Sequence, residues 1–135
     1  MFVIDVSVVV AWYFPDENHP LADTVLQRLS DDSAAAPTLF WFELRNALLV
    51  GERRGRISET DTARILALVG RLPLTIDRDP DEVVIFQLAR TYKLSFYDAA
   101  YLELAQRKNA PIATFDNALV KAAKAEKIAL LNAAK

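Results

Sequence analysis

Residues 1–14 read MFVIDVSVVVAWYF, and this stretch decides the fold class. The apolar run over residues 1–4 is typical of a buried strand, and it ends at Asp5. From Ser7 onward the sequence predicts a short helix that ends near Pro15. A buried strand followed directly by a helix is the repeating unit of α/β domains.

The same alternation of strand and helix continues along the chain. Further short strands are predicted at residues 34–36, 73–76, 111–114 and 128–131. Helices are predicted at residues 20–29, 39–53, 58–70, 79–92, 95–107 and 117–125, with Ser58 to Asp61 as a capping box and Asp79 as an N-cap before Pro80. This order predicts an α/β fold with a mostly parallel sheet of four to five strands. With 135 residues, we expect one domain over residues 1–135.

Composition excludes several classes of active site. The chain has no cysteine, which excludes a disulfide, a thiolate zinc site and a cysteine nucleophile. Its one histidine, His19, excludes sites that need two. Sixteen basic and 18 acidic side chains give a net charge of -2, which predicts no strongly basic face. The longest apolar run, residues 8–14, is too short to span a membrane, so we expect a cytosolic protein.

Three aspartates are predicted to meet at one edge of the sheet. Asp5 follows the first strand, and Asp116 follows the strand at residues 111–114. Both therefore lie at the carboxyl ends of strands, where parallel sheets bind their ligands. Asp98 lies in the first turn of the helix that begins at Ser95. Each aspartate alone could equally be a helix cap, because aspartate is a favoured residue at helix N-termini.

Glu43 is the fourth acid of interest. It is predicted to point toward the apolar side of its helix, because Ala47 and Val50 follow four and seven residues later. A buried glutamate without a partner is costly, although this one could reach Arg45 or extend into solvent.

Four carboxylates in one pocket would repel one another, by about 4 kcal/mol for a pair 4 Å apart at an effective dielectric constant near 20. A bound cation would remove this cost. A site built only from oxygen atoms suits Mg²⁺ or Mn²⁺. We therefore expect metal-assisted hydrolysis of a phosphodiester.

Four segments around these acids resemble the PIN-domain family, and especially the VapC toxins of toxin–antitoxin modules. The segments are IDVSV at residues 4–8, FELRNAL at residues 42–48, YDAAYLELA at residues 97–105, and ATFD at residues 113–116 followed by Leu119, Ala122 and Ala123. Their order and spacing agree with the family pattern over nearly the whole chain.

The resemblance implies a three-layer α/β/α fold and a Mg²⁺- or Mn²⁺-dependent endoribonuclease. It also implies a homodimer that is held inactive by a VapB-type antitoxin. The positions that match the family's acidic cluster and its hydrogen-bonding support are Asp5, Glu43, Asp98, Asp116, Ser7 and Thr114. Asn117 and Ala118 stand where some members carry a further acid, so a second metal would be held more weakly, or only when RNA supplies oxygen ligands.

We expect Asp5, Asp98 and Asp116 to hold the metal, directly or through its waters. Glu43 would bind the metal or orient the attacking water. Asn46 lies on the same helical face as Glu43 and could hold a phosphate or the glutamate itself.

The densest basic cluster contains Arg53, Arg54 and Arg56. It could contact RNA, or it could be a solvated helix end. Consecutive aromatic residues, such as Trp41 and Phe42, cannot all face one core. The remainder are expected to form an antitoxin groove or a dimer surface.

Other functions fit the sequence less well. The main alternative is a catalytically silent PIN domain that binds RNA or protein, and the presence of all four acids disfavours it. A phosphatase with an aspartyl nucleophile would need a second aspartate where Ser7 stands. A receiver-type signalling domain would need a phosphoacceptor aspartate on a central strand near the middle of the chain, and the sequence shows none there.

Overall fold

A parallel sheet forms the centre of the molecule. The computed structural model describes residues 1–17 and 19–131. The strands of the described chain are β1 (Phe2–Ile4), β2 (Ala34–Pro37), β3 (Leu74–Asp77) and β4 (Ile112–Ala113). They lie in the order β3-β2-β1-β4, and every neighbouring pair is parallel. β1 and β4 are therefore adjacent, although more than one hundred residues separate them in the sequence.

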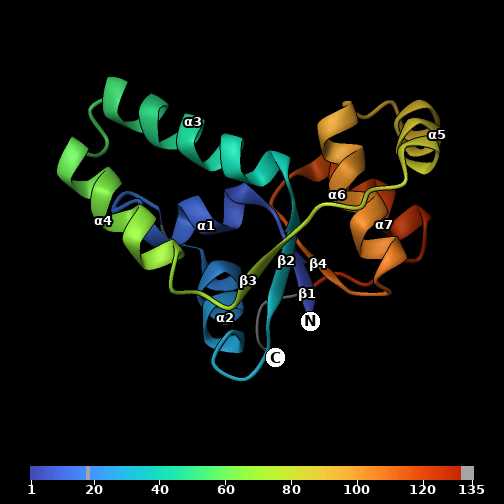
Figure 1. Cartoon of the computed structure of the whole chain (residues 1–135), viewed down its shortest axis with the longest axis horizontal. Coiled ribbons are helices and arrows are strands. Elements are labelled where there is room, and N and C mark those ends of the chain that lie inside the picture. The colour runs from blue at the N-terminus through green and yellow to red at the C-terminus, as the bar shows by residue number, and fades with distance from the viewer. Residues whose placement is uncertain (18, 132–135) are drawn as a thin grey trace.

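Helices cover both faces of the sheet, as the sequence predicts. They are α1 (Val6–Tyr13), α2 (Pro20–Arg28), α3 (Leu39–Arg53), α4 (Glu59–Val69), α5 (Glu82–Tyr92), α6 (Phe96–Arg107) and α7 (Asn117–Ala125). Helices α1 to α4 lie on one side of the sheet and α5 to α7 on the other, with α3 and α4 forming a pair that projects from the sheet (Figure 1). This is the predicted three-layer α/β/α arrangement.

Burial on both faces explains the composition of the central strands. Every residue of β1 and β2 is buried, and β2 contains only small residues and proline, Ala34–Pro37. A parallel sheet covered on both sides needs such continuous apolar strands. Helix α6 packs against β1 and β2, and its residues 99–105 are all buried.

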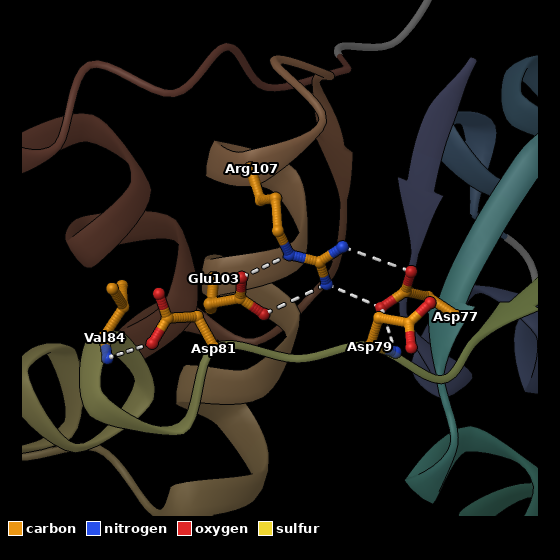
Figure 2. Close-up of polar contacts among 6 residues, drawn as sticks. All are labelled: Asp77, Asp79, Asp81, Val84, Glu103 and Arg107. Carbon is orange, nitrogen blue, oxygen red and sulfur yellow. Dashed lines mark hydrogen bonds and ion pairs between the residues drawn. The ribbon is translucent and has the colours of Figure 1, made fainter.

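One of those buried residues is charged, and it belongs to an ion network. Glu103 is only 2% exposed and accepts a hydrogen bond from Nε of Arg107 at 2.6 Å. The same guanidinium donates to both carboxylate oxygens of Asp77, at 2.5 and 3.2 Å. Figure 2 shows Arg107 lying between the two acids, so that it joins α6 to the end of β3.

The predicted start of the helix at residues 79–92 is wrong. The N-cap is Asp81, whose carboxylate accepts from the amide of Val84, and the helix begins at Glu82. The amide of Asp79 instead donates to Asp77 (Figure 2). By contrast, the capping box between Ser58 and Asp61 is confirmed, with both reciprocal hydrogen bonds present.

Two further expectations need correction. The strand predicted at residues 128–131 is reduced to a single bridge between Ile112 and Leu130. The amide of Ile128 bonds back to the carbonyl of Ala123, and this helix ending uses residues that the strand would need. The buried face of α3 is formed by Phe40, Leu44, Leu48 and Gly51, whereas Ala47 and Val50 are only half-buried.

The last four residues of the expected domain, 132–135, lie outside the described residues. Among the helices that are described, none is both long and apolar enough to cross a membrane.

Candidate active site

Asp5 is fixed in orientation by two hydroxyl groups. It follows β1 directly, and its Oδ2 accepts hydrogen bonds from Ser7 Oγ at 2.9 Å and from Thr114 Oγ1 at 2.7 Å. Thr114 follows β4, the neighbour of β1, and is 5% exposed. The parallel register between β1 and β4 pairs Ile4 with Ala113 and so brings Thr114 beside Asp5. Ser7 and Thr114, which were expected to support the acids through hydrogen bonds, therefore both contact Asp5.

The turn after β4 is tied to the same hydroxyls. The amide of Phe115 donates to Ser7 Oγ, and the amide of Asp116 donates to Thr114 Oγ1. Asp116 is also the N-cap of α7, because its Oδ1 accepts from the amide of Leu119 at 2.9 Å. Asp116 therefore caps α7, and its amide donates to the same Thr114 hydroxyl that donates to Asp5.

Helices α3 and α6 supply the other two acids. Asp98 lies in the first turn of α6, where Ser95 Oγ accepts from its amide at 3.0 Å. One turn later, the hydroxyl of Tyr101 donates to Oε1 of Glu43 at 2.6 Å. This hydrogen bond joins α6 to α3 across the site.

The pKa values of Glu43 and Asp98 respond to the charges of neighbouring acids. Burial raises the pKa of Glu43 above its usual value, and the negative charges of Asp5 and Asp98 raise it further, against the opposing hydrogen bond from Tyr101. Burial likewise raises the pKa of Asp98, and the charges of Asp116 and Asp5 add to the effect. The structure therefore brings Asp5, Glu43, Asp98 and Asp116 into one electrostatic cluster.

The donor set fits a hydrated divalent cation. In the part of the chain that the structure describes, no three acidic or histidine side chains are close enough to form a ready-made metal cage. Mg²⁺ usually keeps several waters and binds through only one or two carboxylates, so it needs no such cage. Burial and neighbouring negative charges raise the pKa values of Glu43 and Asp98, and a cation bound beside them would stabilise their ionised forms. Direct ligation by all three aspartates stays a prediction.

Comparison with models of known families shows which family the chain belongs to. The family model of the PIN domain matches residues 2–125. The chain belongs to the PIN domain family. A search of curated proteins finds no relative of the chain.

Solved structures share the fold of this PIN domain. PAE2754 from Pyrobaculum aerophilum is 23% identical with a TM-score of 0.71, over 90% of this chain and 83% of its own. A toxin–antitoxin complex from Klebsiella pneumoniae is 18% identical with a TM-score of 0.60, over 86% of this chain and 87% of the other. VapC20 from Mycobacterium tuberculosis, a sarcin–ricin loop cleaving toxin, is 13% identical with a TM-score of 0.62, over 90% and 95%.

A groove opens beside Glu43 in this PIN domain. It has a volume of about 450 Å³ and is lined by Leu39, Phe42, Glu43, Asn46 and Tyr97. Asn46 is exposed on α3 and shares this groove with Glu43. Its amide is therefore placed to contact a molecule that enters beside the glutamate.

The arginine cluster lies at the far end of α3. Arg53 and Arg54 are exposed there, about 15 Å along the helix axis from Glu43 at 1.5 Å per residue. Arg56 is engaged within the protein, since its guanidinium donates to both oxygens of Asp16 at 2.7 and 2.8 Å and lies over the ring of Phe14. An RNA contact by Arg56 would have to break or share this ion pair.

Five exposed aromatic rings form a strip beside the acids, which we call the aromatic strip. Its members are Trp41, Phe42, Phe86, Phe96 and Tyr97. Phe86 contacts Phe96 with ring centres 4.9 Å apart, Tyr97 and Phe42 line one groove, and Trp41 contacts Phe42 at 5.1 Å. Sequence analysis identified Trp41 and Phe42 as candidates but missed the other three, because they lie on different helices.

Tyr101 was also missed as a site residue. Tyr101 belongs to the YDAAYLELA segment and lies among the buried residues of α6, where a tyrosine is ordinarily part of the hydrophobic core. Its position three residues after Asp98 is the only signal that the sequence offers.

Proposed function

We propose that this PIN domain is a metal-dependent endoribonuclease that acts as the toxin of a toxin–antitoxin module. The observation that carries the proposal is the electrostatic cluster of Asp5, Glu43, Asp98 and Asp116 at the carboxyl ends of β1 and β4. Membership of the PIN family and the shared fold with VapC20 support it.

In this proposal each residue of the cluster has its own task. Asp5, held by Ser7 and Thr114, is a fixed ligand for Mg²⁺ or Mn²⁺, and Asp98 and Asp116 bind the ion directly or through its waters. The cation, when bound, supplies an activated water and neutralises charge on the phosphodiester. Glu43 accepts the proton of the attacking water on Oε2, because Oε1 already accepts from Tyr101. Asn46 holds a non-bridging phosphate oxygen through its amide.

Cleavage of RNA by the purified protein tests the proposal. We expect cleavage with Mg²⁺ or Mn²⁺ and none in excess chelator. Asp98→Asn should reduce cleavage at least about 100-fold, because one charged group of the cluster is lost. Asp31→Asn is the matched control, since Asp31 is exposed and lies outside the cluster.

Circular dichroism of both variants must show the wild-type fold for the comparison to count. Full activity of Asp98→Asn, or undiminished cleavage in chelator, would contradict the proposed site. A wild-type protein that binds RNA without cutting it would instead support the catalytically silent alternative.

We also propose a VapB-type antitoxin as a partner. The support is the shared fold with a protein of the Klebsiella pneumoniae toxin–antitoxin complex. If a neighbouring reading frame encodes a small protein, that protein is the candidate, and adding it in equimolar amount should suppress the cleavage of RNA.

We also propose that the protein forms a homodimer whose interface lies at the aromatic strip. The five rings are between 39% and 69% exposed and lie on three different helices, α3, α5 and α6. Contiguous exposed aromatic side chains are typical of protein interfaces. A second copy of the chain can bury the part of the strip that lies outside the groove of Phe42 and Tyr97, on both partners, through a two-fold axis, and the groove beside Glu43 then stays open to substrate.

A further inference from the structure

Tyr101 occupies a position between three elements of the site. It lies on α6, one turn after Asp98, and its side chain is fully buried. Its hydroxyl donates to Oε1 of Glu43 on α3, 58 residues away in the sequence. The charge of Asp5, which follows β1, also acts on the phenol. The hydroxyl therefore lies within the field of Asp5 while it donates to the glutamate.

The phenol can only donate to Glu43. Burial raises the pKa of Tyr101 far above its usual value, and the hydrogen bond to Glu43 and the charges of Glu43 and Asp5 raise it further. The neutral phenol is the form that donates to the carboxylate in this contact. Oε1 of Glu43 accepts this bond, and Glu43 also lines the groove beside Asn46.

The hydrogen bond between Tyr101 and Glu43 is short and involves a buried ring, and it restrains the flexible side chain of Glu43. A glutamate has three rotatable bonds, and half-burial alone does not select one rotamer. A donor oxygen 2.6 Å away, on a fully buried ring, leaves Glu43 one orientation relative to Asp98.

We propose that Tyr101 is a positioning residue, which orients Glu43 so that Oε2 faces the attacking water in the groove. This inference rests on the proposed nuclease function. At metal sites, residues that orient the inner carboxylates through a hydrogen bond typically contribute 10- to 100-fold to activity, and we expect an effect of that size here.

The experiment is a double-mutant cycle on RNA cleavage with Mg²⁺. Tyr101→Phe should lower kcat about 10- to 100-fold and leave KM within about twofold, because the ring still fills the core while the orienting bond is lost. In a Glu43→Ala background the same substitution should change the residual kcat by less than about twofold, since no carboxylate remains to orient.

Tyr92→Phe is the matched control. Tyr92 on α5 also donates its hydroxyl to a carboxylate, that of Glu126, but away from the acidic cluster. It should leave kcat within about twofold of wild type. In metal-free protein, the urea midpoint should fall for Tyr101→Phe in the wild-type background and not in Glu43→Ala, which reports the contact independently of activity.

Two sets of outcomes separate this inference from the proposed function. A wild-type protein without metal-dependent cleavage would overturn both. Active wild type with unchanged kcat in Tyr101→Phe, or losses that multiply in the double variant, would overturn the inference alone. Loss of folded structure in Tyr101→Phe would also overturn it, because the phenol would then serve the fold.

Discussion

At the scale of single residues, the acidic cluster places charge where the fold disfavours it. The pKa values of Glu43 and Asp98 are raised first by burial and then by neighbouring carboxylates. The folded protein therefore binds protons more tightly than the unfolded chain at these two groups. Their ionised forms destabilise the metal-free fold as pH rises through the raised pKa values, and this cost disappears as pH falls through them.

The raised pKa of Asp98 predicts how Asp98→Asn changes the stability of the metal-free protein. At pH 7 in chelator, the variant should be more stable than wild type by about 0.5–1 kcal/mol, a rise in melting temperature of about 2–4 °C. The difference should shrink toward zero below about pH 4, where the carboxyl of the wild type is protonated. Urea unfolding across this pH range measures it, and a destabilised variant at pH 7 would contradict the raised pKa.

Residues at strand ends were the most predictable part of the site. Asp5, Thr114 and Asp116 follow β1 and β4 so closely that the parallel sheet alone determines where they lie. Tyr101 could not be predicted in the same way, because its role depends on the angle between α3 and α6. No local pattern in a sequence encodes that angle.

At the scale of elements, α6 is held in place by charge as well as by apolar packing. Glu103 is almost completely buried, and Arg107 links it to Asp77 at the end of β3 (Figure 2). The Arg107 guanidinium lowers the pKa of Asp77 below its usual value. Because α6 also carries Asp98 and Tyr101, this link sets the position of the site residues relative to the sheet.

Arg107→Met should therefore destabilise the protein by about 3–5 kcal/mol, because it leaves Glu103 buried and without its cation. The double variant Arg107→Met with Glu103→Met should recover most of this loss, since the uncompensated charge is gone. Arg64→Met is the control, since Arg64 is 54% exposed and its salt bridge to Asp61, one turn away, lies at the surface, and it should cost at most about 0.5 kcal/mol. Equal losses for the two arginine variants in urea unfolding would refute this account.

Helix ends show where prediction from the sequence stops. Asp79 and Asp81 are both plausible N-caps, and the chain before α5 uses Asp79 in a turn with Asp77 instead. Residues 128–131 have the composition of a strand, but the end of α7 takes the amide of Ile128. In both places two local structures compete for one backbone group, and tertiary packing decides between them.

At the scale of the whole molecule, the aromatic strip makes the proposed dimer testable. Phe86→Arg places a charge in the strip at a distance from the acidic cluster, and it should shift the protein from dimer to monomer in sedimentation experiments. Leu26→Arg is the matched control, because Leu26 is 39% exposed on α2, outside the strip. A Phe86→Arg protein that sediments as wild type, or a wild-type monomer at micromolar concentration, would contradict an interface at this strip.

The overall architecture was predictable because the alternation of short apolar strands and helices allows few arrangements. The parallel sheet and its helical layers follow from that alternation, whereas the strand order β3-β2-β1-β4 was not predicted and comes from the structure (Figure 1). The aromatic strip was only partly predictable, because its members come from three helices that meet only in the folded molecule.

The hydrogen bond from Thr114 to Asp5 spans 109 positions of the chain. During translation, Asp5 emerges early, but the hydroxyl that orients it and the aspartate beside it are made only after most of the chain has been synthesised. If the protein is the nuclease we propose, a chain whose synthesis ends before residue 116 lacks both Asp116 and an assembled site. Cleavage of RNA should therefore begin only after nearly the whole chain has been made.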